Sequence, residues 1–144
     1  MKYDKKYTKE EVLEASKLYF NGDDLAGDKF LKYCLSNNNK EYFELTPDDM
    51  FKNRLAPEFH RIEKKFLNPL GEEEIYDNLK GFKKIVAQGS PMFGIGNDFQ
   101  NVSLSNCVVT EAPEDDVSSI FDVGKTIANF YKARMGCGLD VSLL

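Results

Sequence analysis

The sequence predicts an α+β fold in which a layer of helices, residues 1–87, is followed by one βαβ unit, residues 88–144. In the first part, helix-start residues precede apolar residues at helical spacing four times. In the second part, two stretches of alternating residues flank one long helical stretch, as in a strand-helix-strand unit. The 144 residues, 42% of them hydrophobic, suffice for one domain that buries about 70% of the surface its unfolded chain exposes.

Capping residues mark the first two helices. Thr8 and Glu11 have the spacing of a capping box, and Gly22 can end the first helix in the left-handed conformation. Asp23 or Asp24 can cap the second helix. Two apolar stripes are expected to face inward, Val12, Leu13, Ala15 and Leu18 on the first helix and Leu25, Phe30, Leu31 and Leu35 on the second. Cys34 lies on the second stripe, so an inert buried thiol is favoured there over a reactive one.

Two further helices are expected before residue 87. The hydroxyl of Thr46, the ring of Pro47 and the acids at 48 and 49 suit a helix start, and Met50, Leu55, Phe59 and Ile62 continue an apolar stripe. Pro57 lacks a backbone donor, which predicts a kink or break near Leu55-Ala56. His60 has no carboxylate or second histidine at ligand spacing, so we expect it to face solvent. The fourth helix begins near Glu72, with Ile75, Leu79 and Phe82 on its apolar side.

The predicted βαβ unit begins after an irregular stretch from Val86 to about Gln100. The glycines in this loop permit close approach of a ligand, although Gly94-Ile95-Gly96 alone also fits a tight turn. From Asn101 to Thr110, alternation puts Ser103, Ser105, Cys107 and Val109 on one face and Val102, Leu104, Asn106 and Val108 on the other. Cys107 would then share a polar face with two hydroxyl groups. A buried structural thiol is the alternative for Cys107.

Asp115 and Asp116 can cap the long helix that follows, and its apolar stripe is Val117, Ile120, Phe121, Ile127 and Met135. Gly136 is expected to close this helix, and Gly124 within it suggests close approach by another helix. Residues 138–144 alternate again and predict a second strand, parallel to the first, with a right-handed crossover. Two strands do not make a stable sheet, so other strands are expected to complete it.

Charge and composition exclude several functions. A net charge of −5, with lysines scattered among acids, disfavours a nucleic-acid surface. No apolar run approaches the roughly 20 residues of a membrane helix. The charged first residues lack the apolar segment of a secretory signal, so we expect a cytoplasmic, reducing location with free thiols. Three cysteines at 34, 107 and 137 fit neither a disulfide framework nor a zinc clamp.

Several motifs occur together and in one order along the chain. The longest runs from Gln88 to Asp98, and the most specific are Ser105-Asn106-Cys107 and the residues 135–140, Met-Gly-Cys-Gly-Leu-Asp. Weaker matches are Thr8–Val12, Leu45–Met50 and Arg61–Lys65. In this order they resemble the large subunit of ribonucleotide reductases that lack an N-terminal ATP cone. The resemblance spans almost the entire chain and implies that residues 88–144 begin a ten-stranded α/β barrel, which in the family continues for several hundred residues.

The resemblance also implies roles for particular residues. Ser90, Asn106, Cys107 and Gly136 would contact a ribonucleotide substrate, with Cys107 as one of two thiols that reduce the ribose. Asp115, Asp116 and Val117 would begin the binding site of a deoxynucleotide effector. The helix over residues 116–135 would form part of a homodimer interface.

The reaction that the resemblance implies proceeds through radicals. A thiyl removes the 3′ hydrogen of the ribose, water leaves from C2′, and Cys107 with a second cysteine supplies two electrons. The chain lacks the motifs of the radical-bearing cysteine and of the second redox cysteine, so it would need the remainder of the large subunit. This segment is expected to bind no cofactor itself, and the radical would come from adenosylcobalamin or from a metal-containing small subunit. The alternative is a non-catalytic module that binds nucleotides or a large subunit.

Overall fold

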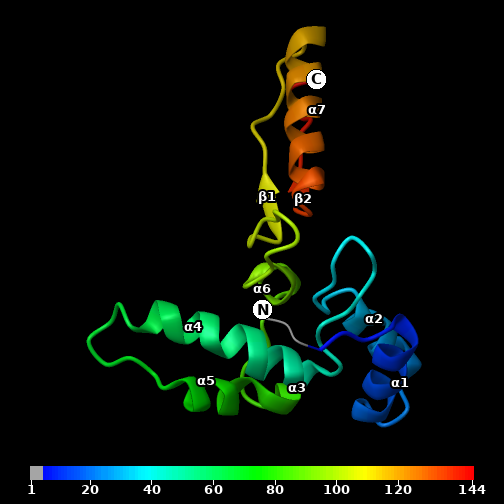
Figure 1. Ribbon diagram of the computed structural model, residues 1–144. Helices are drawn as coiled ribbons and strands as arrows, with labels where there is room; N and C mark the ends of the chain where they lie inside the picture. The colour runs from blue at the N-terminus through cyan, green and yellow to red at the C-terminus, as the bar shows by residue number, and fades with distance from the viewer. Residues whose placement is uncertain (1–4) are drawn as a thin grey trace.

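The computed structural model describes residues 5–144. Residues 1–4, part of the charged start of the chain considered above, lie outside the described range. The elements are α1 (Lys9–Tyr19), α2 (Asp24–Leu31), α3 (Pro47–Met50), η1 (Phe51–Leu55), α4 (Ala56–Glu63), α5 (Glu72–Leu79), η2 (Lys80–Phe82), α6 (Gly89–Gly94), β1 (Cys107–Val109), α7 (Val117–Lys132) and β2 (Gly136–Gly138). Figure 1 shows α1–α5 as a broad helical layer from which β1, β2 and α7 project, with α6 at the junction. The α+β class is therefore confirmed in its coarse form.

The capping box predicted for α1 is confirmed. The Thr8 hydroxyl accepts a hydrogen bond from the Glu11 amide, and the Thr8 amide donates to the Glu11 carboxylate at 2.7 Å. Asp23 caps α2. The inward placement of Leu18 and Leu25 is wrong, because these side chains are 76% and 64% exposed.

The reason for this difference is the way α1 and α2 meet. They approach through Ser16 and Gly27, since a Cβ added to Gly27 would stand 3.1 Å from the Ser16 hydroxyl oxygen. Both of these small residues are buried. Contact through small residues brings the two backbones close and leaves the neighbouring leucines on the outside.

The irregularity predicted near Leu55-Ala56 is confirmed, and it is a π-helical turn in place of a break. The Ala56 amide donates to the carbonyl of Phe51, five residues earlier, and η1 covers Phe51–Leu55. The wider turn accommodates Pro57, which has no amide to donate and whose ring crowds the preceding turn. Helix α3 before it starts with the expected cap, in which Thr46 and Asp49 bond each other's amides.

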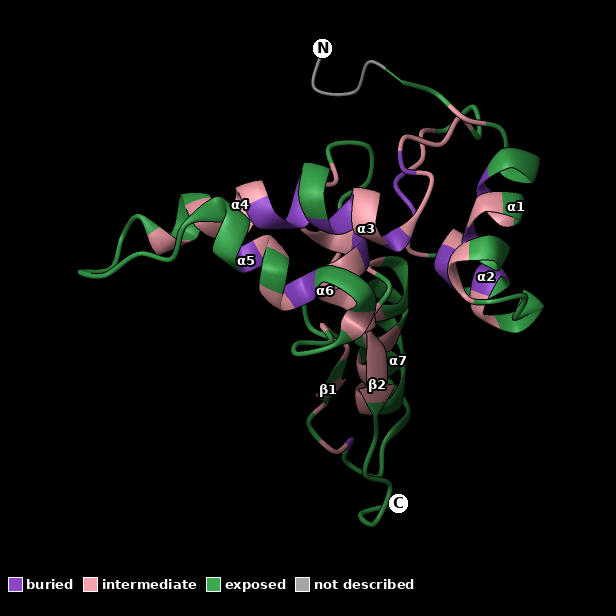
Figure 2. Cartoon of the chain, turned by 90° about the horizontal axis from the view of Figure 1, so that it is seen from below, coloured by how far each residue is buried: buried purple, intermediate pink, exposed green. Residues whose placement is uncertain are grey.

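One hydrophobic core lies within the helical layer. Its buried members come from α1, α2, α3, η1, α4 and α5 and the segment after α2: Val12, Phe30, Cys34, Met50, Phe51, Leu55, Ala56, Ile75 and Leu79. Cys34 is 1% exposed, which confirms the buried thiol, and burial raises its pKa well above the ordinary range. Figure 2 shows the buried residues concentrated in this layer, while α7 is largely exposed.

The parallel βαβ arrangement is confirmed, but its strands are shorter than predicted. Cys107 pairs with Gly136, Val108 with Cys137 and Val109 with Gly138. The strand expected over 101–110 is reduced to 107–109, because the Ser103 amide bonds the Ala133 carbonyl after α7 at 2.9 Å and turns the chain away. The second strand covers 136–138, and the expectation of a strand from 138 to 144 is wrong.

The ends of α7 also differ from expectation. Asp116 is the N-cap, and Asp115 precedes it. The helix ends at Lys132, and Arg134, not Gly136, adopts the left-handed conformation that closes it, with φ of 60°. A Cβ added to Gly124 would have nothing within 4 Å, so within the described residues no helix approaches there.

The loop expected over residues 86–100 contains a short helix, α6. Met92 of this helix and the following Ile95 pack against the core of the helical layer, and Phe93 is buried. The division of the chain at residue 87 stays a prediction. None of the helices over residues 5–144 has the length and hydropathy needed to cross a bilayer.

Candidate functional site

A buried ion pair holds the junction between the helical layer and α6. Arg54 is 0% exposed, and its guanidinium donates to both carboxylate oxygens of Glu44, at 2.5 and 3.1 Å. The same guanidinium donates to the carbonyls of Met92 at 2.8 Å and Ile95 at 2.7 Å. These carbonyls lie at the C-terminal end of α6, where helix carbonyls lack partners and a positive charge is favoured. Arg54 therefore fixes the position of α6.

Ser90 and Asn106, two of the predicted substrate contacts, are brought together by α6. The Ser90 amide donates to the Asn106 side-chain oxygen at 2.8 Å, and the Asn106 side-chain nitrogen donates to Gln88 at 2.9 Å. Asn106, the residue directly before β1, is thus bonded to the start of α6. Its side chain is oriented by two hydrogen bonds, which is the property required of a group that positions a ligand.

Cys107 and Gly136 are direct partners in the parallel sheet. The Gly136 amide donates to the Asn106 carbonyl at 2.7 Å, and a Cβ added to Gly136 would stand 3.2 Å from the Cys107 sulfur. A larger residue at 136 would therefore crowd the thiol. Cys107 is exposed, as a reactive thiol requires.

The polar face predicted for Cys107 does not form as an extended strand. Ser103 and Ser105 precede β1, and their hydroxyls bond Met135 and the Cys107 carbonyl, at 3.4 and 3.2 Å. Cys107 shares its strand face with Val109 instead. Cys137 pairs with Val108, so its side chain points to the opposite face from Cys107. The two thiols are not placed to form a disulfide with each other.

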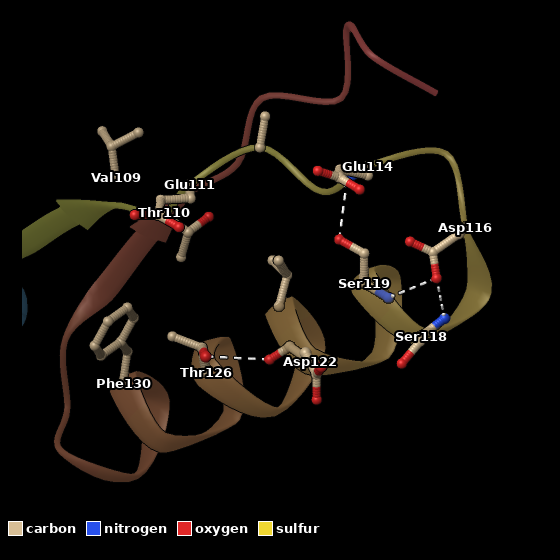
Figure 3. A pocket seen from close by; sticks show the side chains of 12 residues that line it. Val109, Thr110, Glu111, Glu114, Asp116, Ser118, Ser119, Asp122, Thr126 and Phe130 are labelled. Carbon is tan, nitrogen blue, oxygen red and sulfur yellow. Dashed lines mark hydrogen bonds between the residues drawn. The ribbon is translucent and has the colours of Figure 1, made fainter.

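The predicted effector residues lie beside a cleft of about 660 Å³ between the segment after β1 and α7 (Figure 3). Asp116 lines this cleft and accepts hydrogen bonds from the Ser118 and Ser119 amides, at 2.8 and 3.1 Å. Asp115 and Val117 are not part of its lining. Four carboxylates and no lysine or arginine line the cleft, the acidic members being Glu111, Glu114, Asp116 and Asp122.

His60 differs from its predicted exposed position. It is half-buried, and its Nδ1 lies 2.9 Å from the Leu70 carbonyl, which ties α4 to the loop before α5. Within residues 5–144, no group of three or more His, Cys, Asp or Glu side chains is placed to hold a metal ion.

Sequence patterns missed Arg54 and Glu44, because a lone arginine within a helix is usually solvent-exposed. The available signal was the position of Arg54 next to Leu55 and four residues after Met50, on the apolar side of the turn.

Comparisons with protein-family models, curated proteins and solved structures found no significant match to this chain. The resemblance therefore rests on the motifs alone. Ser90, the adjacent residues Asn106 and Cys107, and Gly136 come from three separate parts of the chain and lie together where α6 meets β1 and β2.

Proposed function

We propose that this chain is the N-terminal portion, or a split piece, of a ribonucleotide reductase large subunit. It would supply substrate contacts through Ser90, Asn106 and Gly136 and one redox thiol, Cys107, and it would be inactive alone. The observation that carries the proposal is the convergence of these four residues. Ser90 bonds Asn106, Asn106 precedes Cys107, and Cys107 faces the glycine that leaves room for its sulfur.

Each group has a part in the proposed reaction. Ser90 and Asn106 would orient the ribose, and the absent side chain of Gly136 would let the sugar approach the backbone. Cys107 and a second cysteine would each give up a hydrogen atom and form a disulfide, while the ribose loses its 2′ hydroxyl as water. Because Cys137 lies on the opposite face of the two-stranded sheet from Cys107, the second cysteine would come from another segment. The radical-bearing thiol would come from another segment as well.

The exposed surfaces support the proposal that additional polypeptide packs against this chain. The sheet has two strands, so each strand has an unpaired edge. On α7, Val117 and Phe121 are 70% and 74% exposed. In the proposed assembly, the missing strands complete the ten-stranded barrel, and the face of α7 contacts a second copy.

The 660 Å³ cleft beside α7 is the proposed effector site. Its volume lies within the range of roughly 300–1,000 Å³ typical of small-molecule sites. Its four carboxylates would repel a nucleotide's phosphates, so the effector would bind with accompanying cations or with basic residues of another chain. Binding of a deoxynucleotide should therefore depend strongly on a divalent cation or on assembly.

Reconstitution tests the proposed function. The chain would be mixed with a polypeptide that carries the remaining strands of a reductase barrel and with a radical generator, and deoxynucleotide formation would be measured. We expect turnover only in the mixture, and we expect Cys107→Ser to abolish it while nucleotide binding is retained.

Cys137→Ser is the matched control, since this thiol lies on the neighbouring strand but on the opposite face, and it should retain turnover. Deoxynucleotide production by the isolated chain, or full turnover by the Cys107→Ser assembly, would contradict the proposal. An assembly that binds nucleotides but never reduces them would favour the non-catalytic module.

A further inference from the structure

A separate cleft of about 230 Å³ opens between α6 and the turn after α7. Its lining residues come from four parts of the chain: Tyr33, Gly89, Ser90, Phe93, Val102, Ser103, Asn106 and Arg134. Cys107 and Gly136 are not among them. The cleft is therefore distinct from the surface that presents the thiol, although Ser90 and Asn106 border both.

The cleft is rich in hydrogen-bond donors without partners. The Arg134 guanidinium, the Tyr33 hydroxyl and the Ser90 hydroxyl have no hydrogen-bond or ion-pair partner among residues 5–144. No carboxylate lines the cleft. It thus carries a positive charge on a protein whose net charge is −5, the opposite of the acidic cleft beside α7.

The backbone at Arg134 is held in an unusual conformation. Arg134 has φ of 60° at the position that ends α7, where the Met135 amide bonds the Phe130 carbonyl at 3.0 Å. Glycine is the usual residue there, because a side chain in the left-handed region costs roughly 1 kcal/mol or more. Arg134 is one of four non-glycine residues with positive φ among residues 5–144, and its strained backbone means that a substitution by glycine should not lower stability.

Neighbouring side chains orient the guanidinium and open the cleft. The guanidinium carbon lies 3.8 Å from the centre of the Phe93 ring, a stacking that restricts the plane of the arginine fork. On the other side, a Cβ added to Gly89 would stand 3.0 Å from the Tyr33 ring and 3.1 Å from its hydroxyl oxygen. The glycine therefore lets Tyr33 lie directly against the start of α6.

We propose that this cleft binds the phosphate end of a small phosphorylated ligand, with Arg134 as the principal anchor. A planar carboxylate would use the arginine fork alone, whereas the several oxygens of a phosphate can also accept from the two hydroxyls. The volume falls below the roughly 300–1,000 Å³ of sites that enclose whole ligands, so it suits a phosphate or diphosphate group.

This subsite goes beyond the proposed function and does not depend on it. Ser90 is also one of the proposed substrate contacts, so the test uses phosphate binding by the chain itself and no measurement of turnover. A failure of the reductase proposal would not contradict the phosphate subsite, and a failure of the phosphate subsite would not contradict the proposed role of Cys107.

The test is calorimetric titration of the 144-residue chain with inorganic pyrophosphate at low salt, together with its thermal unfolding. We expect Arg134→Gly to weaken binding at least tenfold while its Tm stays equal or rises, because glycine relieves the left-handed backbone. Tyr33→Phe and Ser90→Ala should each weaken binding about threefold to tenfold. The control Arg61→Gln removes the same charge from α4, where Arg61 pairs with Glu58, and should leave affinity within twofold.

Three ligands complete the experiment. A nucleoside diphosphate should bind at least as well as pyrophosphate, and the bare nucleoside should not bind through Arg134. Succinate should bind at least tenfold more weakly than pyrophosphate. Equal affinity for succinate, undiminished pyrophosphate binding by Arg134→Gly, or an equal loss in Arg61→Gln would overturn the proposal.

Discussion

The helical layer and the βαβ unit differ in how far they bury apolar side chains, although their helices share the same kind of sequence pattern. Both contain helices with an apolar stripe, but among residues 5–144 all eleven buried hydrophobic residues lie between Val12 and Phe93. Helix α7 has no buried residue over its 16 positions. Figure 2 shows this contrast directly. An apolar stripe therefore predicts a helix, whereas burial requires a second surface, and the described part of the chain provides none for α7.

The contrast also separates the sources of stability in the two regions. The layer combines a contiguous core with the buried Arg54–Glu44 pair, while the βαβ unit relies on backbone pairing and on the caps of α7. Three measurements can break or sharpen this comparison.

The largest effect is expected from Glu44→Gln. The substitution leaves the buried guanidinium of Arg54 without its counter-charge, which typically costs about 3–5 kcal/mol in the free energy of unfolding. Urea denaturation measures it. Asp24→Asn removes the exposed pair with Lys17 and should cost about 1 kcal/mol or less. Equal costs would mean that the buried pair does not hold the layer together.

The next effect compares one apolar residue from each region. Leu55→Ala should lower the free energy of unfolding by about 2–5 kcal/mol, because Leu55 is fully buried in η1. Phe121→Ala in α7 should change it by less than about 0.5 kcal/mol, since Phe121 is 74% exposed. A large loss for Phe121→Ala at low protein concentration would show that α7 is covered in solution, contrary to the contrast described above.

The smallest effect concerns pH and Cys34. Burial, with a contribution from Glu44, raises the pKa of the Cys34 thiol, so folding favours its protonated form. The resulting stability is fully present below the unfolded thiol's pKa of about 8.5 and is lost as pH rises toward the folded pKa, by up to about 1.4 kcal/mol per pH unit. The measurement is urea denaturation of wild type and Cys34→Ala from pH 7 to 10. Parallel pH profiles of the free energy of unfolding for the two proteins would contradict a contribution of the Cys34 thiol to this pH dependence.

Features set by local hydrogen bonds were predictable from sequence. The caps at Thr8, Thr46 and Asp116 are of this kind, because each bonds an amide two or three residues away. The parallel pairing of the strands also followed from the order of the elements.

Features set by distant contacts were not predictable. The alternation over 101–110 predicted a long strand, but the Ser103 amide found its partner at Ala133. Of the candidate site, the sequence motifs named the residues that meet, and they missed Arg54, whose partners come from α6. The left-handed conformation of Arg134 was not predicted either, since it depends on how α7 ends.

The burial of Arg54 has a consequence for the time course of folding. Its charge can pair with Glu44 across 10 residues, but its bonds to the carbonyls of Met92 and Ile95 span 38 and 41 residues and form only after a loop of that length has closed. Closing such a loop costs conformational entropy before the new contact stabilises the chain, so this step is slower than helix formation. On a ribosome, the layer can therefore assemble fully only after Ile95 has left the exit tunnel. The segment that carries Ser90 is in place as soon as the first stable core exists.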